Sequence, residues 1–271
     1  MGFVAKKCVI LGCQKLFMAR VEDFFILDNA VEGITPEDYH NISDIVDSVA
    51  AFSRMTYKSV YIIDYNKKNF LYVSDNPLFL CGLSANEVKE IGYKFYIDNV
   101  PQEDVERLLK INEAGFRFSR DIPADEKRHY TLSYNFRIIN TISKRVQTIN
   151  HLLTPLKMLP DGTIWLAMCV ASLPTRAGND AVVMFNNRTN ERWDLDLEHN
   201  MWRKVPHLAL TEQETQVIKL SAMGYTTHEI ADMMCRSFDT VKGYRKSILE
   251  KFNTENIVEA INYAMTYRLI N

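Results

Sequence analysis

The chain has few glycines and prolines and no long apolar run, and each shortage excludes a class of protein. It has 10 Gly and 8 Pro among 271 residues, with 47% hydrophobic and 24% charged residues, which excludes disordered, collagen-like or low-complexity character for most of the chain. The longest nearly unbroken apolar run, Ile164 to Leu173, has ten residues, whereas a membrane-spanning helix needs about 20. We therefore expect no transmembrane segment and no membrane partner.

The cysteines and histidines show no metal-binding or disulfide pattern. The five cysteines, at positions 8, 13, 81, 169 and 235, form no CxxC pair and are odd in number, which predicts reduced, mostly buried thiols. The six histidines are scattered without HExxH spacing, so no metal site is expected. The apolar stretch from Cys8 to Cys13 has six residues and is too short for a secretory signal. These features predict a cytoplasmic protein.

Composition changes near Pro206, and 271 residues suffice for two domains of about 150 residues each. Residues 207–271 predict helices only, and a capping residue begins each of the first three. The predicted starts are the capping boxes of Thr211 with Glu214 and of Thr226 with Glu229, Ser237 before a third helix that ends near Phe252, and about Glu255 for a fourth that ends near Tyr267.

Two short helices joined by the turn Cys235 to Ser237 have the arrangement of a helix-turn-helix. The net charge of the chain is −2, so a polyanion would have to be held by a local patch, and between Arg236 and Lys251 five basic residues stand against two acidic ones. Helical spacing predicts Val241, Tyr244, Ile248 and Phe252 on the inner face of the third helix and Lys242, Gly243, Arg245 and Lys246 on its outer face.

This segment resembles the DNA-binding domain of LuxR-type regulators. The residues that carry the resemblance are Leu210, Thr211, Glu214, Val217, Leu220, Ala222, Gly224, Glu229, Ile230, Ala231, Ser237, Thr240, Val241, Lys242, Lys251 and Phe252. The resemblance implies that the third helix lies in the major groove of double-stranded DNA, with Lys242, Gly243 and Lys246 reading bases and Thr240 and Arg245 contacting phosphates. Thr227 and Ser237 are also expected at the DNA. Arg236, Gly243 and Tyr244 depart from the family pattern, which leaves the target sequence open.

Residues 58–175 predict a β-rich domain with a defined order of elements. The expected elements are strands 59–65 and 70–74, short helices 76–82 and 84–88, a longer helix from Pro101 to Ala114 or Gly115, and strands 130–141, 145–159 and 163–173. This order, with the hairpin sequence LPDGTIW, resembles a PAS domain. The predicted fold class is α+β: a PAS-like antiparallel sheet with helices, followed by an all-α four-helix helix-turn-helix domain.

Two segments flank this PAS-like region. In residues 1–57, Thr35 and Pro36 begin a helix to about Met55 that would serve either as a dimer contact or as packing on its own sheet. Residues 176–206 predict a hairpin and linker that join the two domains.

No cofactor is predicted, and a small-molecule ligand of the PAS-like domain remains unknown. PAS relatives either enclose a ligand or have a filled core, and the sequence leaves both open. Cys81 is followed by Gly82 where flavin-binding relatives have Arg, and the helix after Pro101 has no His for haem. His129 and His151 are interpreted as sheet-surface or hydrogen-bonded residues. The aromatic residues interpreted as core are Tyr61, Phe79, Phe95, Tyr134, Phe136 and Trp165.

The function favoured by these patterns is sequence-specific transcription regulation, modulated by the PAS-like domain. An enzyme with a helical appendage is the alternative, but GxSxG, GxxxxGK[ST] and GxGxxG are absent from the sequence. A receiver-type response regulator would need an acidic pair after its first strand, and Gln14 follows Cys13 instead. The expected partners are DNA, RNA polymerase and a second copy of the chain, contacted through Ile257, Ile261 and Met265. Residues 207–271 are expected to fold and bind DNA alone.

Overall fold

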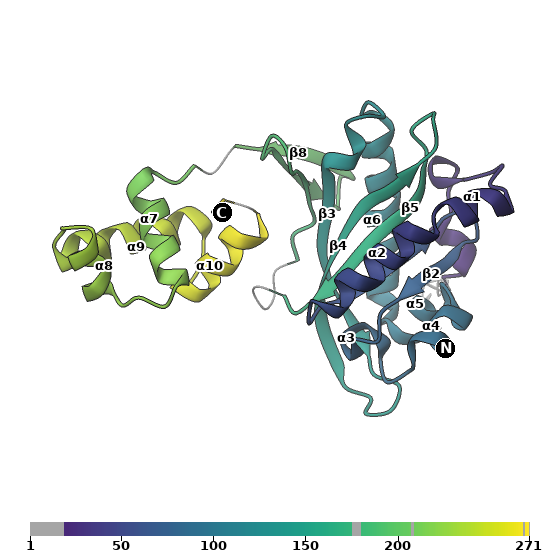
Figure 1. The fold of residues 1–271 in the computed structure, drawn as a ribbon, viewed down its shortest axis with the longest axis horizontal. Helices are drawn as coiled ribbons and strands as arrows, with labels where there is room; N and C mark the ends of the chain where they lie inside the picture. Colours follow the sequence, from purple (N-terminus) through teal and green to yellow (C-terminus); the bar gives the residue numbers. More distant parts are fainter. Residues whose placement is uncertain (1–18, 175–179, 207–208, 268, 271) are drawn as a thin grey trace, which may run out of the picture.

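The computed structural model describes residues 19–174, 180–206, 209–267 and 269–270. They form two bodies, a larger N-terminal domain and a smaller helical C-terminal domain, joined near Pro206 (Figure 1). The predicted apolar stretch from Cys8 to Cys13 lies outside the described residues. Among the helices that the structure describes, none is long and apolar enough to cross a membrane.

In the described residues, eight strands form one sheet. They are β1 (Ser59–Asp64), β2 (Asn69–Val73), β3 (Tyr130–Ile139), β4 (Val146–Met158), β5 (Ile164–Ser172), β6 (Val183–Asn186), β7 (Arg192–Asp196) and β8 (Met201–Val205). The strand order is β2-β1-β5-β4-β3-β6-β7-β8 and every pair is antiparallel. This sheet confirms the predicted α+β class, and it differs from the parallel sheet that a receiver domain would need.

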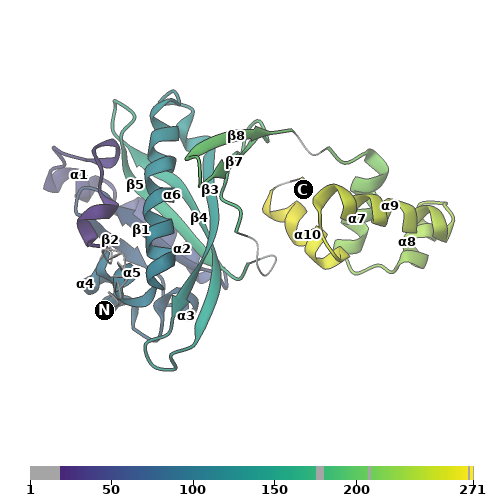
Figure 2. The ribbon, with the colours of Figure 1, turned by 180° about the vertical axis from the view of Figure 1, so that it is seen from behind.

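Helices cover both faces of the sheet. The 3-10 helices are η1 (Val21–Phe24), η2 (Leu27–Asn29) and η3 (Lys127–His129), and the α-helices of this domain are α1 (Pro36–Asn41), α2 (Ser43–Arg54), α3 (Pro77–Leu80), α4 (Ala85–Ile91), α5 (Lys94–Asn99) and α6 (Gln102–Arg120). Helix α2 lies on one face of the sheet, and α6 crosses the other (Figures 1 and 2). The predicted order of two strands, small helices, a longer helix and three strands is confirmed.

The structure corrects several predicted boundaries. The helix predicted from Pro36 to Met55 breaks at Ile42, which turns inward and is 2% exposed. Helix α6 continues through Gly115 to Arg120. At Gly115 the helix packs closely on Leu132, whose nearest atom would lie 3.3 Å from an added Cβ. Helix α5 and strand β8 were not predicted. Residues 183–205 extend the sheet through pairing of β6 with β3, so they belong to the N-terminal domain instead of forming a separate joint.

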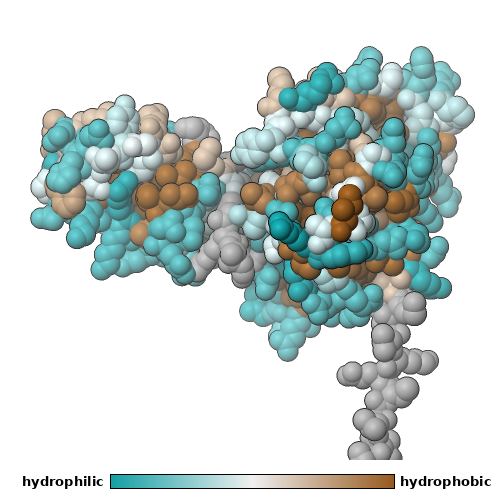
Figure 3. All heavy atoms as spheres, turned by 90° about the horizontal axis from the view of Figure 1, so that it is seen from below, coloured by the Kyte–Doolittle hydropathy of each residue, from teal (hydrophilic) through white to brown (hydrophobic). Residues whose placement is uncertain are grey.

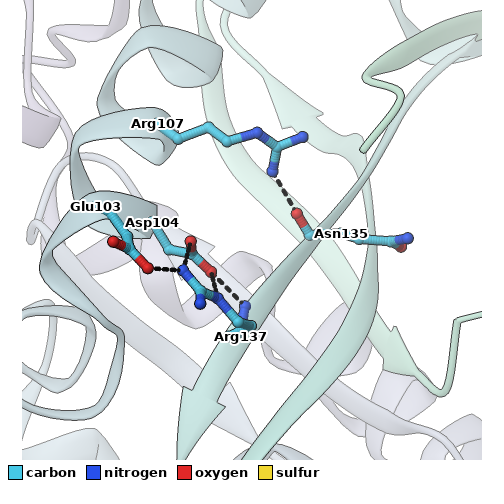
Figure 4. Close-up of polar contacts among 5 residues, drawn as sticks. All are labelled: Glu103, Asp104, Arg107, Asn135 and Arg137. Atoms are coloured by element: carbon cyan, nitrogen blue, oxygen red, sulfur yellow. Dashed lines mark hydrogen bonds and ion pairs between the residues drawn. The ribbon is translucent and has the colours of Figure 1, made fainter. Parts of the chain in front are cut away.

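Charged side chains fasten α6 to the end of β3. The guanidinium of Arg137 on β3 bonds both carboxylate oxygens of Asp104 at 2.7 and 3.0 Å and also pairs with Glu103 (Figure 4). One turn along the helix, Arg107 donates to the carbonyl oxygens of Asn135 at 2.5 Å and of Asp180 at 2.6 Å. Both arginines satisfy backbone or carboxylate acceptors at a sheet position that β6 no longer covers, because β6 pairs with β3 only as far as Ser133.

The C-terminal domain consists of four helices in the described residues, as predicted. They are α7 (Glu212–Ala222), α8 (Thr227–Met233), α9 (Phe238–Phe252) and α10 (Ile257–Thr266). The side chains at the centre of its core are fully buried: Val217, Ile218, Ile230, Val241, Ile248, Ala260 and Ala264. This cluster is separate from the core of the N-terminal domain. Each domain therefore has its own hydrophobic core.

Candidate nucleic-acid interface

The turn between α8 and α9 is fixed by hydrogen bonds local to the sequence. Thr226 accepts from the Glu229 amide while the Glu229 carboxylate accepts from the Thr226 amide, so the predicted capping box at α8 is confirmed. Helix α8 ends in a turn in which Cys235 takes a left-handed conformation with φ 50° and the Arg236 amide donates to the Ala231 carbonyl at 2.9 Å. Ser237 then accepts from the Thr240 amide and begins α9. These bonds fix the angle at which α9 leaves α8.

A buried carboxylate holds α9 against α7. Glu214, the acidic residue of the Thr211 capping box, is 3% exposed and accepts from the Lys251 ammonium at 2.6 Å and from the Ser247 hydroxyl at 2.7 Å. Burial raises the pKa of Glu214, but the hydrogen bonds from Lys251, the Thr211 amide and Ser247 outweigh burial and lower it to about 2. The sequence predicts Glu214 only as part of the cap. Ser247 and Lys251 are four residues apart on α9 and therefore face the same side of that helix, and this spacing is the signal that could have indicated a shared partner.

The predicted inner and outer faces of α9 are largely confirmed. Val241, Ile248 and Phe252 are buried and Tyr244 is half-buried, whereas Lys242, Gly243 and Lys246 are exposed. No atom lies within 4 Å of a Cβ added at Gly243, so packing inside the protein does not require glycine there. Lys246 forms only a loose, exposed ion pair with Glu250 at 3.7 Å. The outer face therefore offers two exposed ammonium groups, and Gly243 between them carries no side chain.

Arg245 does not lie on the open outer face, and this part of the prediction is corrected. Its guanidinium reaches back to the preceding helices, donating to the Thr227 hydroxyl at 2.6 Å and to the Ser221 hydroxyl at 3.0 Å. The side chain is half-buried, and burial lowers its pKa from the usual value. Arg245 therefore ties α9 to α7 and to the start of α8, and any contact with a phosphate would be made from that fixed position.

The remaining predicted DNA-contacting residues lie at helix starts. Ser237 and Thr240 are exposed, and their hydroxyls bond each other at 2.8 Å in the first turn of α9. Thr227 is half-buried at the start of α8 and holds Arg245. The structure thus brings Thr227, Ser237 and Thr240 close to the two helix N-termini, where backbone amides and the helix dipole favour anions.

Sequence reasoning missed an exposed aromatic pair at the same place. The ring of His228 on α8 stacks on the ring of Phe238, the first residue of α9, with centroids 4.3 Å apart and planes at 27°. Phe238 is 38% exposed and is not part of the core of the domain. Phe238 comes directly after the predicted N-cap Ser237, where a large apolar side chain does not help to start a helix. This position is the signal in the sequence that could have indicated the aromatic pair.

The predicted apolar stripe on α10 is partly used inside its own domain. Ile257 and Ile261 are half-buried and pack against the core of that domain. Met265 is 62% exposed, and so is Val258, which lies on the same helix. The outward face of α10 therefore includes the predicted Met265 together with Val258, which was not predicted.

The interior of the N-terminal domain is filled by its own side chains, many of which are aromatic. The predicted core residues Tyr61, Phe79, Phe95, Phe136 and Trp165 are all buried, and Tyr134 is half-buried. The Tyr61 hydroxyl bonds His151 Nε2 at 2.5 Å and the Tyr96 hydroxyl at 2.8 Å. Burial lowers the pKa of His151 to about 3, so this histidine is neutral, hydrogen-bonded and inside the sheet.

A small cavity remains between α6 and the sheet. Its volume is about 60 Å³ and its lining is mostly apolar, with Phe118, Leu132 and Met184 among the lining residues. Within the described residues no group of three or more His, Cys, Asp or Glu side chains could hold a metal ion. Cys81 and Cys169 are free and buried, as predicted, whereas Cys235 is exposed.

The C-terminal domain matches a known family. Residues 208–264 match the model of the bacterial regulatory proteins of the luxR family, so this domain is a LuxR-type helix-turn-helix domain, as its residues indicated. The response regulator protein VraR of Staphylococcus saprophyticus is 30% identical over 91 residues, which are 34% of this chain and 38% of VraR. The transcriptional regulatory protein LiaR of Bacillus subtilis is 32% identical over 75 residues, 28% of this chain and 36% of LiaR. The chain thus spans little more than a third of these relatives.

Solved structures are similar to longer parts of the chain. The phage VqmA–DPO complex is 18% identical and covers 86% of this chain and 91% of its own, with a TM-score of 0.31. VqmA of Vibrio cholerae is 16% identical; the match covers 83% of this chain and 89% of VqmA, with a TM-score of 0.33. A PAS domain from Colwellia psychrerythraea is 11% identical; the match covers 48% of this chain and 98% of that domain, with a TM-score of 0.36.

Proposed function

We propose that this protein is a sequence-specific DNA-binding transcription regulator whose helix α9 enters the major groove. The observation that carries the proposal is the outer face of α9, where Lys242, Gly243 and Lys246 stand exposed on a helix whose angle is fixed by Glu214 and Arg245. Lysine ammonium groups at a groove edge donate to guanine O6 and N7, and a helix of this diameter fits the major groove. The luxR-family match over residues 208–264 supports the same role.

The base-reading role falls to the outer face of α9, and the phosphate-binding role falls to the N-termini of α8 and α9. Lys242 and Lys246 would read bases, and the backbone at Gly243 either approaches the bases closely or leaves one base pair unread. Thr240 and Ser237, at the N-terminus of α9, would bind a phosphate. Thr227 and Arg245 would support these residues and would also face the phosphate backbone of the DNA. Such phosphate contacts set the position of the protein without reading sequence.

The N-terminal domain would modulate DNA binding, and its closely packed interior supports a role in signal relay and protein contacts. A regulator of this type acts in the cytoplasm, binds DNA as a homodimer and contacts RNA polymerase. An enzymatic role receives no support from the described residues, where buried titratable groups such as His151 and Tyr61 are sealed in the core. The family model likewise describes regulatory proteins.

A binding-site selection tests the proposal. Randomised duplex DNA is mixed with the full chain at moderate salt, and retained sequences are amplified over several rounds. We expect one enriched sequence, bound at least about 1,000-fold more tightly than random DNA. The Lys242→Ala, Lys246→Ala double variant should lose that enrichment while keeping its folded circular dichroism spectrum. Retention of DNA without any enriched sequence would contradict sequence-specific regulation.

A further inference from the structure

An aromatic pair stands on the surface of the C-terminal domain where α8 meets the start of α9. The ring of Phe238, the first residue of α9, stacks on the ring of His228 in the first turn of α8, with centroids 4.3 Å apart. Both residues are exposed, and Phe238 is not part of the hydrophobic core of the domain. This apolar ring is therefore held in one place without contributing to the core.

Local hydrogen bonds fix the backbone under both rings. His228 lies inside the capping box that Thr226 forms with Glu229. Phe238 directly follows the N-cap Ser237, whose hydroxyl accepts from a backbone amide of the first turn of α9 at 3.1 Å. The stacking of the two rings also restricts rotation of both side chains. A side chain fixed in this way loses little conformational entropy when it contacts a partner.

Phe238 belongs to the same row of side chains as the two lysines of the outer face. Phe238, Lys242 and Lys246 follow one another at intervals of four residues and so lie next to each other along one side of α9. With a rise of about 1.5 Å per residue, each interval covers about 6 Å of the helix. A helix that brings the two lysines to base edges therefore also brings the Phe238 ring into the same groove.

The N-terminal domain leaves this ring open. α8 and the start of α9 lie at the end of the C-terminal domain that points away from the N-terminal domain (Figure 1). On the face seen from below, this end shows mainly hydrophilic residues, and the hydrophobic surface of the domain gathers nearer the linker (Figure 3). Phe238, which is 38% exposed, is thus an apolar side chain at a mainly polar end of the domain.

The chemistry of the major groove decides which group a phenyl ring can meet there. Phosphates and the polar edges of bases offer charges and hydrogen-bonding groups, with which a phenyl ring cannot pair. The apolar group that B-DNA presents in the major groove is the C5-methyl group of thymine. Insertion of an apolar wedge between base pairs is typical of proteins that bind the minor groove. One face of the Phe238 ring is also already covered by His228.

We propose that Phe238, backed by His228, reads the methyl group of one thymine in the target site. This inference rests on the proposed DNA-binding function and adds one base to it. An interval of about 6 Å along the helix corresponds to roughly two base pairs of DNA. The thymine therefore lies about two base pairs from the base read by Lys242, on the side away from the base read by Lys246. Phe238 makes the contact, and His228 is a positioning residue that holds the ring.

The test removes a single methyl group from the DNA. In the site selected with the native chain, each thymine is replaced in turn by deoxyuridine, which keeps base pairing and lacks only the C5-methyl group. Fluorescence anisotropy measures binding by the native chain and by full-length Phe238→Ala, His228→Ala and His228→Tyr, the last of which keeps a ring for stacking. Circular dichroism verifies that each variant is folded.

Val258→Ala is the matched control. Val258 is an apolar residue that is 62% exposed, and it lies on α10, at the other end of the domain from α8 (Figure 1). Its removal takes away exposed apolar surface without touching the start of α9. The quantity compared is the ratio of affinities for thymine and deoxyuridine, so that a general change in DNA affinity does not count.

One deoxyuridine position should weaken binding by the native chain about fourfold, the factor expected for burial of one methyl group. The same replacement should have no effect in Phe238→Ala and a smaller effect in His228→Ala. His228→Tyr and Val258→Ala should show the full effect. The sensitive position should lie on the side of the base preference relaxed by Lys242→Ala that faces away from the one relaxed by Lys246→Ala.

Three results would overturn the reading of thymine by Phe238. They are an equal deoxyuridine effect in the native chain and in Phe238→Ala, a selected site without any sensitive position, and a sensitive position on the Lys246 side of the base read by Lys242. An undiminished effect in His228→Ala would overturn the role of that ring. A native chain that enriches no sequence at all overturns the proposed function and this inference together, whereas the other results leave the proposed function intact.

Discussion

The ammonium of Lys251 lies 2.6 Å from the carboxylate of Glu214, and the Glu214 side chain is only 4% exposed. This pair joins the last turn of α9 to the first turn of α7. Because the carboxylate also accepts from the Thr211 amide and the Ser247 hydroxyl, its burial is compensated by hydrogen bonds from three directions.

Stability of the DNA-binding domain should fall with acid through this carboxylate. Its pKa is lowered from 4.5 to about 2 in the folded state, so its contribution is complete above about pH 4.5 and is lost as the pH falls toward 2. Glu214→Gln should be destabilised by roughly 1 to 3 kcal/mol at neutral pH and should lose this pH dependence. Urea melts followed by circular dichroism measure both effects. The exposed Glu212→Gln variant on the same helix is the control, and equal losses in the two variants would contradict the assignment.

Stability of the N-terminal domain should also depend on pH, through His151. Its folded pKa of about 3 lies below the usual 6.5, so the unfolded chain takes up a proton first as the pH falls. The free energy of unfolding should decrease by up to about 1.4 kcal/mol per pH unit below pH 6.5, until the folded histidine itself titrates near pH 3. His151→Gln should flatten this dependence, whereas His199→Gln, at an exposed site, should keep it. A slope that persists unchanged in His151→Gln would exclude this histidine as its source.

Loss of one reading lysine should weaken the best DNA site far more than random DNA. Lys242→Ala or Lys246→Ala should cost roughly 1 to 3 kcal/mol at the selected site and relax the base preference at one position. Fluorescence anisotropy with single-base variants of the site measures this effect. Lys219→Ala on α7 removes the same charge from another helix, and a similar loss of sequence preference in that variant would argue against base reading by α9.

Arg245 should behave as a supporting residue, not as a simple phosphate contact. Arg245→Ala removes two hydrogen bonds to Ser221 and Thr227 and should destabilise the domain by about 1 to 3 kcal/mol, while weakening all DNA sequences to a similar extent. Arg245→Lys keeps the charge but not the two-pronged geometry, so it should recover the salt dependence of DNA binding without recovering stability. Full recovery of both by lysine would show that charge alone matters.

Gly243→Ala should stabilise α9, because an added Cβ meets no atom within 4 Å and alanine favours the helix by about 1 kcal/mol. The DNA affinity of the same variant distinguishes the two roles left open for this position. A loss of affinity indicates close approach of the backbone to the bases, and unchanged affinity indicates an unread base pair. A lower melting temperature would contradict the predicted gain in stability.

The sequence predicts best where structure depends on near neighbours. The capping residues Thr211, Thr226 and Ser237 were correctly placed, because a cap is a contact between residues three positions apart. Helical periodicity predicts the direction in which each α9 side chain leaves the helix, but not where its far end lies. The prediction therefore places Arg245 on the open face, although its long side chain folds back to α7. The role of Glu214 required knowledge that Lys251, 37 residues away, lies beside it.

The missed elements lack local signals of their own. Helix α5 begins after Tyr93 without a side-chain cap, and it is held in place by the burial of Phe95 and Tyr96 in the core. Strand β8 is mostly exposed and exists through its pairing with β7 from Met201 to Val205. Both depend on long-range contacts, which a pattern of neighbouring residues does not contain.

The continuity of the sheet from β3 into β6 decides where this protein could be recombined with others. A chimera joined at residue 176 would remove β6 and leave the backbone of β3 from Tyr130 to Ser133 without its hydrogen-bonding partner, as a bare strand edge that invites aggregation. It would also uncover Leu132 and Ile111, which β6 and β7 help to bury through Met184 and Leu195. A junction after Val205 keeps all strands of the sheet in the N-terminal part of the chimera. DNA-binding domains can therefore be exchanged between regulators of this kind at that position.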